Sequence, residues 1–154
     1  MHFYLTAPSN SISLVGWQGI GTATNPFKGV FRCGKYNPDP ASNNTNETGE
    51  QNVGDQDTIV YAGAEFPLFN YCNGATIDNI HVKGDISINA SLETGLGAIC
   101  DYAENTTISH CTNATSLSNY NNLNTLSIGG IVGIATNCTI DSCSNNISIS
   151  AGTP

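Results

Sequence analysis

Basic side chains are scarce in this sequence. Only four of its 154 residues are Lys or Arg, against 12 Asp or Glu, and the formal net charge is −8 although just 10% of the residues are charged. A surface without a basic patch attracts neither nucleic acid nor an anionic membrane. We therefore expect no nucleic-acid partner.

Long apolar runs are lacking as well. None approaches the roughly 20 residues needed to span a bilayer, so we expect no membrane insertion. The N-terminal stretch MHFYLTAPSN has neither the basic nor the apolar segment of a signal peptide. On this ground the chain is either cytosolic or a mature or excised piece of a longer precursor. Its length predicts a single domain over residues 1–154.

Cysteine and asparagine, by contrast, are plentiful. The six cysteines form an even number, which favours an oxidising compartment. Seven of the 20 Asn residues begin an Asn-X-Ser/Thr sequon, whereas chance pairing with Ser and Thr would give roughly four. We therefore expect an extracellular or cell-surface protein that carries N-linked glycans and no other cofactor. The predicted glycosylation sites are Asn43, Asn46, Asn89, Asn105, Asn113, Asn137 and Asn146.

An internal repeat organises the second half of the chain. Residues 67–80, 98–111 and 130–143 align without gaps, at offsets of 31 and 32 residues. One column contains Ile80, Cys111 and Cys143, so these cysteines occupy an apolar core position, where a buried thiol packs like a small hydrophobic side chain. The other matched columns are Leu68/Ile99/Ile131, Phe69/Cys100/Val132, Thr76/Thr107/Thr139 and Ile77/Ile108/Ile140.

The repeat predicts an all-β fold. Its segments are short, rich in Ile, Val and Thr, and interrupted by Gly and Asn. They lack the 3.6-residue period of a helical solenoid and the ladder of a leucine-rich repeat. Stacked short strands with tight corners are typical of a parallel β-helix, in which neighbouring rungs lie about 4.8 Å apart. We therefore predict a parallel β-helix of about five rungs with protruding loops.

Two corners are predicted in each rung. Gly74, Asn105 and Asn137 share a column, and Gly and Asn are the residues that best tolerate a left-handed backbone. Ile77 and Ile80 are three residues apart and cannot both point inward from one flat strand. A bend is therefore expected between them.

Polar segments between the strands are predicted to protrude as loops. The longest is a low-complexity insertion over residues 37–56, and shorter loops are expected at 90–96 and 118–125. At the start of the chain, HFYLT and SISLV alternate with a period of two. The alternation predicts four inward side chains, Phe3, Leu5, Ile12 and Leu14.

Several motifs carry a resemblance to a known family. Trp17-Gln18-Gly19-Ile20-Gly21 is followed by Pro-Phe-x-Gly-x-Phe at residues 26–31, after Leu-Thr at 5–6 and Ile-Ser-Leu at 12–14. Gly-Gly-Ile-Val-Gly spans 129–133 and Thr-Ile-x-x-Cys spans 139–143. Together these residues resemble the GLUG-type β-helix repeats of bacterial and protist surface proteins, including the appendages of IgA-cleaving metallopeptidases.

The resemblance covers nearly the whole chain apart from residues 36–57. It departs from the family pattern at residues 32–34, where Arg-Cys-Gly replaces the usual Asp-Gly, and at 67–70, where Pro-Leu-Phe-Asn replaces Gly-Leu-Phe-Gly. The resemblance implies a right-handed β-helix at a cell surface. It implies no catalytic residues, because the family motif is a packing motif.

One column offers a candidate catalytic site. Asp78, Ser109 and Asp141 align, with His110 beside them. An inverting glycosidase needs two carboxyls about 6.5–9.5 Å apart, and two rungs would separate Asp78 from Asp141 by about 9.6 Å. The sequence suggests no basic residue nearby, however, and Asp at the end of a strand is commonly a turn former. We therefore expect no enzyme activity.

Other polar groups are expected to be structural. Cys138, Cys143 and His110 lack the short Cys-X2-Cys spacing of a zinc site. Asp55 and Asp57 supply too few oxygen ligands for calcium, so we expect no metal. Trp17 and the six tyrosines could in principle stack on sugars, but we expect Trp17 to cap the core.

The cysteines offer candidate disulfides. Cys111 and Cys143 lie in one column on adjacent rungs, so their Cα atoms are expected about 4.8 Å apart, within the range of a disulfide. Buried thiols are an equal alternative, because stacked parallel side chains do not always allow the required torsion. The weaker candidate pairs are Cys100 with Cys138 and Cys33 with Cys72.

Three functions are compatible with these expectations. The first is an N-glycosylated structural β-helix that associates head to tail as a subunit or segment of a surface filament or stalk. The second is an adhesin or glycan-binding module of a larger surface protein, binding a glycan or host-surface ligand through loops 37–56 and 118–125. The third is a carbohydrate-active enzyme using Asp78 and Asp141, which we expect least.

Overall fold

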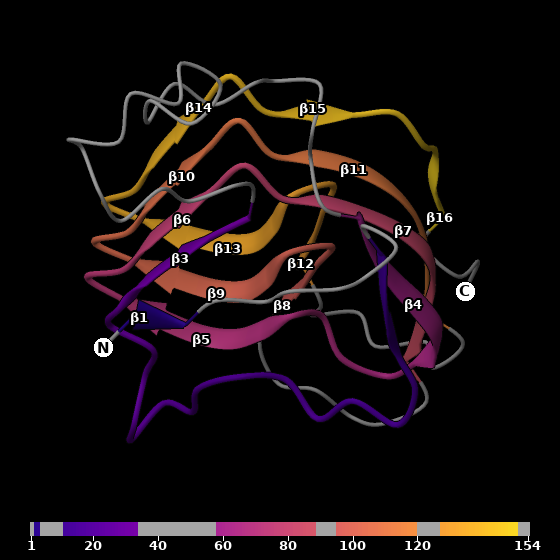
Figure 1. Cartoon of the computed structure of the whole chain (residues 1–154), viewed down its shortest axis with the longest axis horizontal. Coiled ribbons are helices and arrows are strands. Elements are labelled where there is room, and N and C mark those ends of the chain that lie inside the picture. The colour runs from indigo at the N-terminus through magenta and orange to yellow at the C-terminus, as the bar shows by residue number, and fades with distance from the viewer. Residues whose placement is uncertain (1, 4–10, 34–57, 89–94, 120–126, 151–154) are drawn as a thin grey trace, which may run out of the picture.

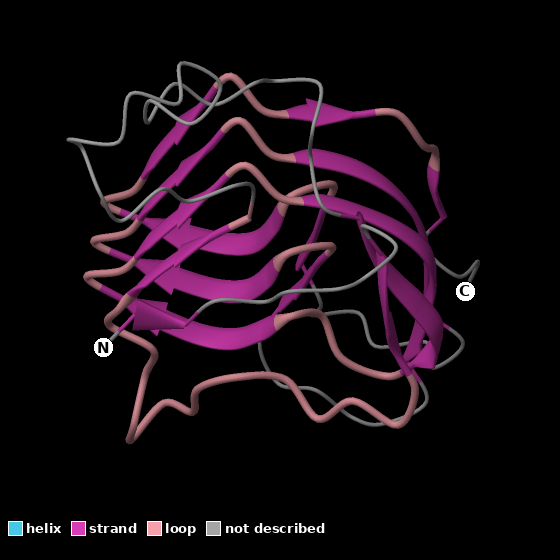
Figure 2. Cartoon of the chain, viewed as in Figure 1, coloured by secondary structure: helices cyan, strands magenta, loops and turns pink. Residues whose placement is uncertain are grey.

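The computed structural model describes residues 2–3, 11–33, 58–88, 95–119 and 127–150 (Figure 1). Within these ranges the protein is all-β and contains no helix (Figure 2). Among the described residues there is therefore no helix that could span a membrane. All strand pairs in these ranges are parallel.

Three stretches of chain stack on one another, and we call them the first repeat (residues 67–88), the middle repeat (95–119) and the last repeat (127–150) (Figure 1). Their strands pair in the register that the sequence alignment predicts. Thr107 and Ile108, for example, are opposite Thr76 and Ile77 on one side, and opposite Thr139 and Ile140 on the other. The predicted columns are therefore confirmed.

The first sheet contains the Thr-Ile-Asp or Thr-Ile-Ser segment of each repeat. Its strands follow the order β1-β3-β6-β10-β14. Their bounds are β1 His2–Phe3, β3 Val30–Arg32, β6 Thr76–Asp78, β10 Thr107–Ser109 and β14 Thr139–Asp141.

A second sheet follows the order β15-β11-β7-β4-β2, and β16 also pairs with β11. Its long central strands carry Val82 and Ile86 into the core, both completely buried. The bounds are β2 Ser11–Leu14, β4 Thr58–Ala64, β7 His81–Ile88, β11 Thr112–Asn119, β15 Ser144–Asn145 and β16 Ile149–Ser150.

Two smaller sheets contain the remaining described strands. A three-stranded sheet has the order β13-β9-β5, and β12 pairs with β8. The bounds are β5 Phe69–Asn73, β8 Gly95–Gly97, β9 Cys100–Glu104, β12 Ser127–Gly129 and β13 Val132–Thr136.

The corners of the repeats are left-handed, as predicted. Gly74, Asn105 and Asn137 have φ values of 72°, 47° and 52°. The second bend falls on the residue before the Ile80/Cys111/Cys143 column, at Asn79, His110 and Ser142, with φ values of 58°, 51° and 52°. These residues turn the chain so that Ile77 and Ile80 can both face inward.

The core lies between the sheets and contains the predicted apolar columns. Phe69 is completely buried and contacts the rings of Phe27 and Phe31, with centroids 5.0 and 5.3 Å apart. The two phenylalanines of the Pro-Phe-x-Gly-x-Phe segment thus pack against the first repeat. Trp17 packs against the same core, and its indole nitrogen donates a hydrogen bond to the Pro67 carbonyl at 3.0 Å.

The N-terminal strands follow the predicted alternation in part. Leu14 packs against the core. Phe3 and Ile12 lie on strands, opposite Phe31 and Ile59. Leu5 lies outside the described residues.

The predicted loops need two corrections. Residues 37–56 lie outside the described residues, as does most of 90–96 and 118–125. Leu96, however, belongs to β8 and is completely buried. Its glycine neighbours make this position possible, because a Cβ on Gly97 would lie 2.2 Å from the Cys100 carbonyl oxygen. Ser118 likewise belongs to β11 and not to a loop.

Candidate functional site

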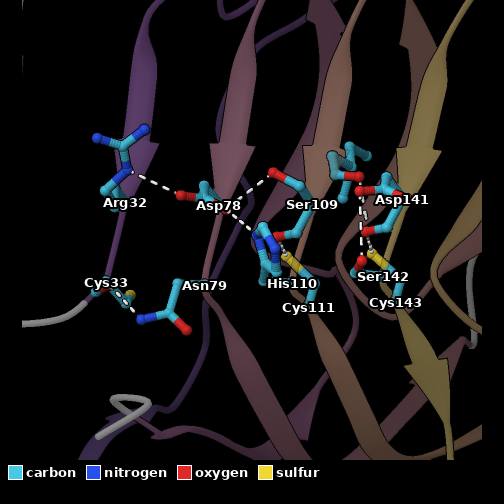
Figure 3. A network of polar contacts seen from close by, with 11 residues as sticks. Arg32, Cys33, Asp78, Asn79, Ser109, His110, Cys111, Asp141, Ser142 and Cys143 are labelled. Carbon is cyan, nitrogen blue, oxygen red and sulfur yellow. Dashed lines mark hydrogen bonds and ion pairs between the residues drawn. The ribbon is translucent and has the colours of Figure 1, made fainter. Parts of the chain in front are cut away.

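A polar network surrounds Asp78 at the end of β6 (Figure 3). One carboxylate oxygen accepts a hydrogen bond from Arg32 Nε at 2.9 Å, forming an ion pair. The other accepts from Ser109 Oγ at 2.8 Å and lies 3.0 Å from His110 Nδ1. Three side chains from two segments of the chain therefore converge on one carboxylate.

Parallel register explains this convergence. Arg32, Asp78 and Ser109 are direct partners on β3, β6 and β10, so their side chains stack on one face of the sheet. His110 follows Ser109 at the left-handed corner, where the turned backbone brings its ring back toward Asp78.

Arg32 corrects the expectation that no basic residue lies near Asp78. The sequence contained a signal for it, since Gly-Val-Phe-Arg at 29–32 aligns with Ala-Thr-Ile-Asp at 75–78, as the β3–β6 register shows. The two segments share apolar character at one position but no identical residue. The alignment was therefore missed.

The two carboxyls of the candidate catalytic column have different surroundings. Asp78 is 4% exposed and has three donors. Asp141 is exposed, and Ser142 Oγ donates to it at 3.2 Å. The hydrogen bond with Asp78 raises the pKa of His110, whose cationic form the buried carboxylate stabilises. These contacts join three strands and leave little of the Asp78 carboxylate exposed to a substrate.

The thiols occur as two neighbouring pairs. Cys111 and Cys143 are neighbours on adjacent repeats, as their column predicts. The Cys111 thiol donates to the Ser109 carbonyl at 3.0 Å, and the Cys143 thiol donates to the Asp141 carbonyl at 3.3 Å. Cys100 neighbours Cys72, which together with burial raises the pKa of the Cys100 thiol. Cys100 was predicted to pair with Cys138 and Cys72 with Cys33, whereas the structure places Cys72 beside Cys100, and no disulfide joins any of the six cysteines.

The strand register explains why the second pair was not predicted. Cys72 and Cys100 are both completely buried, but they lie three residues out of register, since Cys100 is opposite Phe69 and Cys72 is opposite Ala103. The Cys138 thiol instead donates to the backbone carbonyls of Ala103 and Thr136, each at 3.3 Å. A column-by-column comparison of the repeats could not reveal a diagonal pair.

Among the described residues, no three His, Cys, Asp or Glu side chains are grouped as a metal site requires. The zinc candidates Cys138, Cys143 and His110 all lie in the described ranges. Asp55 and Asp57 lie outside the described residues.

The predicted glycosylation sites divide by exposure. Asn105, Asn137 and Asn146 are exposed. The prediction for Asn113 needs correction. Its side chain is completely buried, its amide nitrogen donates to Asn145 and its oxygen accepts from the Thr115 amide. No space is left there for a glycan. Asn43, Asn46 and Asn89 lie outside the described residues.

Asparagines also form a ladder along one corner. Asn105 Nδ2 donates to Asn73 Oδ1 at 3.3 Å, and Asn137 Nδ2 donates to Asn105 Oδ1 at 2.5 Å. The stacked amides link the three repeats at the solvent-exposed edge. A glycan on Asn137 would share its amide nitrogen with this ladder.

The outer face of the β13-β9-β5 sheet carries a pair of aromatic rings. Tyr71 and Tyr102 stack with centroids 4.3 Å apart and an interplanar angle of 23°. Beside them, Asn73 Nδ2 donates to the Glu104 carboxylate at 2.9 Å. Aromatic and polar side chains therefore share one partly exposed surface.

Asp101 is a buried acid that the sequence analysis did not single out. It is 3% exposed and accepts a hydrogen bond from the Gly97 amide at 3.2 Å. Burial raises the pKa of its carboxyl to about 8, because the charged form loses solvation. Its column contains Asn70 and Gly133 in the other repeats, so no shared pattern marked it.

Comparison with known proteins adds no assignment. No family model, no curated protein and no solved structure matches the chain. The resemblance to GLUG-type repeats therefore stays a prediction.

Proposed function

We propose that this chain is a right-handed parallel β-helix of about five rungs that serves as an extracellular, N-glycosylated structural element. In this proposal it is a subunit or segment of a surface filament or stalk, assembled head to tail, and it is not an enzyme.

The exposed end of the stack is the observation that carries the proposal. Ile77 and Ile108 are completely buried, whereas Ile140, in the same column, is 46% exposed. Among the described strands, β14 has a neighbour on one side only. An unpaired strand edge with an exposed core side chain is a template for another strand.

The proposed contact repeats what the molecule already does internally. Each repeat pairs with the next in parallel, with like residues opposite each other. A head-to-tail contact of this kind does not close on itself and therefore extends into a filament.

Association of the pure protein tests the filament. We expect rods by electron microscopy and concentration-dependent growth in sedimentation velocity. Ile140→Lys should abolish both, because it places a charge in the contact. Thr107→Lys is the matched control, since Thr107 is exposed on the central strand β10 and should leave assembly unchanged. A wild-type protein that stays monomeric at all concentrations contradicts the proposal.

Intact mass after secretion from eukaryotic cells tests the glycans. The expected mass exceeds the 16.1 kDa of the chain. Asn137→Gln should remove one glycan, and Asn113→Gln should remove none. A secreted protein at the bare mass refutes the glycosylated surface.

A glycan-binding module is the second candidate, and the Tyr71–Tyr102 surface favours it. Aromatic rings beside an amide and a carboxylate are typical of sugar-binding faces. A glycan array with the wild-type protein and Tyr102→Ala distinguishes the two candidates. Binding that is lost in the variant, with a monomeric wild type, would favour the module.

A further inference from the structure

The second thiol of the Cys111–Cys143 pair is accessible, unlike the thiols of the other pair. Cys111 is completely buried, whereas Cys143 is half-buried at the exposed end of the stack. Cys72 and Cys100 are both completely buried. Of the two pairs, only the first therefore contains a cysteine that is partly open to solvent.

The backbone holds the two residues side by side. Ser109 pairs with Asp141 and Thr112 pairs with Ser144, so Cys111 and Cys143 lie opposite each other between two registered pairs. The Ser144 amide donates to the Cys111 carbonyl at 2.9 Å. Parallel neighbours lie about 4.8 Å apart, within the Cα separation of a disulfide.

The surroundings favour a thiolate on Cys143. The neighbouring Cys111 lowers the pKa of Cys143 to about 7. The nearby His110 also lowers it, and the Asp141 carboxylate opposes this effect. Asp78, 3.0 Å from His110 Nδ1, raises the pKa of His110 and so favours its cationic form (Figure 3). By contrast, the Cys143 thiolate and burial raise the pKa of Cys111.

We propose that Cys143 and Cys111 form a redox-active dithiol in which Cys143 attacks and Cys111 resolves. The substrate class is a small disulfide such as oxidised glutathione. The site needs only two adjacent repeats, but Cys143 lies at the end of the stack that the proposed filament contact would cover, so the reaction belongs to the unassembled chain.

The reaction balances as a two-step exchange. The Cys143 thiolate attacks one sulfur of the small disulfide, forms a mixed disulfide and expels one thiolate. Cys111 then loses its proton to solvent and attacks the Cys143 sulfur, which releases the second small thiolate. The dithiol is oxidised by two electrons, and the small disulfide is reduced to two thiols.

The product would have a structural consequence. A Cys111–Cys143 bond joins the last repeat covalently to the middle repeat. A loop of about 30 residues closed in this way loses unfolded-state entropy, which stabilises the folded chain. Oxidation would therefore fasten the exposed repeat in place.

The test uses the reduced full-length chain and oxidised glutathione without oxygen, followed by acid quenching and peptide mass mapping. We expect the wild type to lose two hydrogens and to yield a Cys111–Cys143 bond. Cys111→Ala should retain one glutathione on Cys143, because nothing resolves the mixed disulfide. Cys138→Ser is the control, a half-buried cysteine of the same repeat whose loss should not change the product.

Alkylation of the wild type gives a readout that needs no variant. Iodoacetamide should modify Cys143 about threefold or more faster than Cys138 at pH 7, because more of Cys143 is thiolate. Equal rates, a disulfide between other cysteines, or glutathione attached to Cys111 in Cys143→Ser would each overturn the proposal. Circular dichroism checks that Cys111→Ala is folded. If it is not, the alkylation ratio of the wild type tests the proposal.

Discussion

The middle and last repeats present similar residues in the same register, but to different surroundings. Ile108 is completely buried and Ile140 is 46% exposed, and Cys111 is completely buried while Cys143 is half-buried. The middle strand β10 has neighbours on both sides, whereas β14 has one among the described strands. A residue's burial is therefore set by the place of its repeat in the stack as much as by its own type.

Truncating Ile108 and Ile140 should show the difference between the two repeats most strongly. Ile108→Ala leaves a cavity in a closed core and should lower the free energy of unfolding by about 2–5 kcal/mol. Ile140→Ala removes a side chain that is already half in solvent, and should lower it by about 1 kcal/mol. Urea denaturation of the two variants measures the difference, and equal losses would contradict the contrast between the repeats.

Asp101, the buried acid of the middle repeat, should make stability depend on pH in a way that the exposed acid of the last repeat does not. The pKa of Asp101 rises from 3.8 to about 8 on folding, so the folded state binds more protons than the unfolded state between these values. Its contribution to stability is therefore fully present below pH 4 and is lost as the pH rises toward 8.

Asp101→Asn should remove this dependence, because Asn is the residue at the same position of the first repeat. We expect the variant to gain on the order of 2 kcal/mol over the wild type at pH 9, and little at pH 4. Thermal or urea unfolding at the two pH values provides the measurement. Asp141→Asn in the last repeat is the exposed control, and a parallel shift in both variants would show that burial is not the cause.

The left-handed corners should show the smallest effect. Asn105→Ala and Asn137→Ala place a β-carbon in a left-handed conformation, at a cost of about 1–2 kcal/mol each. The loss in Asn105→Ala should be the larger of the two, because Asn105 bonds to both neighbours of the amide ladder and Asn137 bonds to one among the described residues. Glycine at either position should cost less stability than alanine. If glycine costs more than alanine, backbone strain is excluded as the cause.

The repeat itself could be predicted from sequence because three copies share Thr, Ile and corner residues at a constant offset. That offset determined the strand register, the inward columns and both bends. Leu96 was wrongly placed in a loop, since a single leucine between glycines has no periodicity, and its burial depends on a partner strand 32 residues away.

The candidate site could be predicted only in part. Asp78, Ser109 and His110 were found because they lie in the aligned segments, whereas Arg32 lies in a divergent copy that shares no residue with them. Asn113 illustrates another limit, because a sequon is a three-residue pattern that carries no information about which face of a strand the asparagine occupies. The Cys72–Cys100 neighbours are diagonal, and such contacts depend on packing that no column displays.

The parallel register of the three repeats also bears on how the molecule opens. Because each repeat contacts mainly the repeats next to it, disrupting β14 leaves the pairing of β10 with β6 untouched. Local opening should therefore begin with fraying of the last repeat and progress inward one repeat at a time. Amide protons would then exchange in a gradient along the stack, fastest on β14 and slowest on β6.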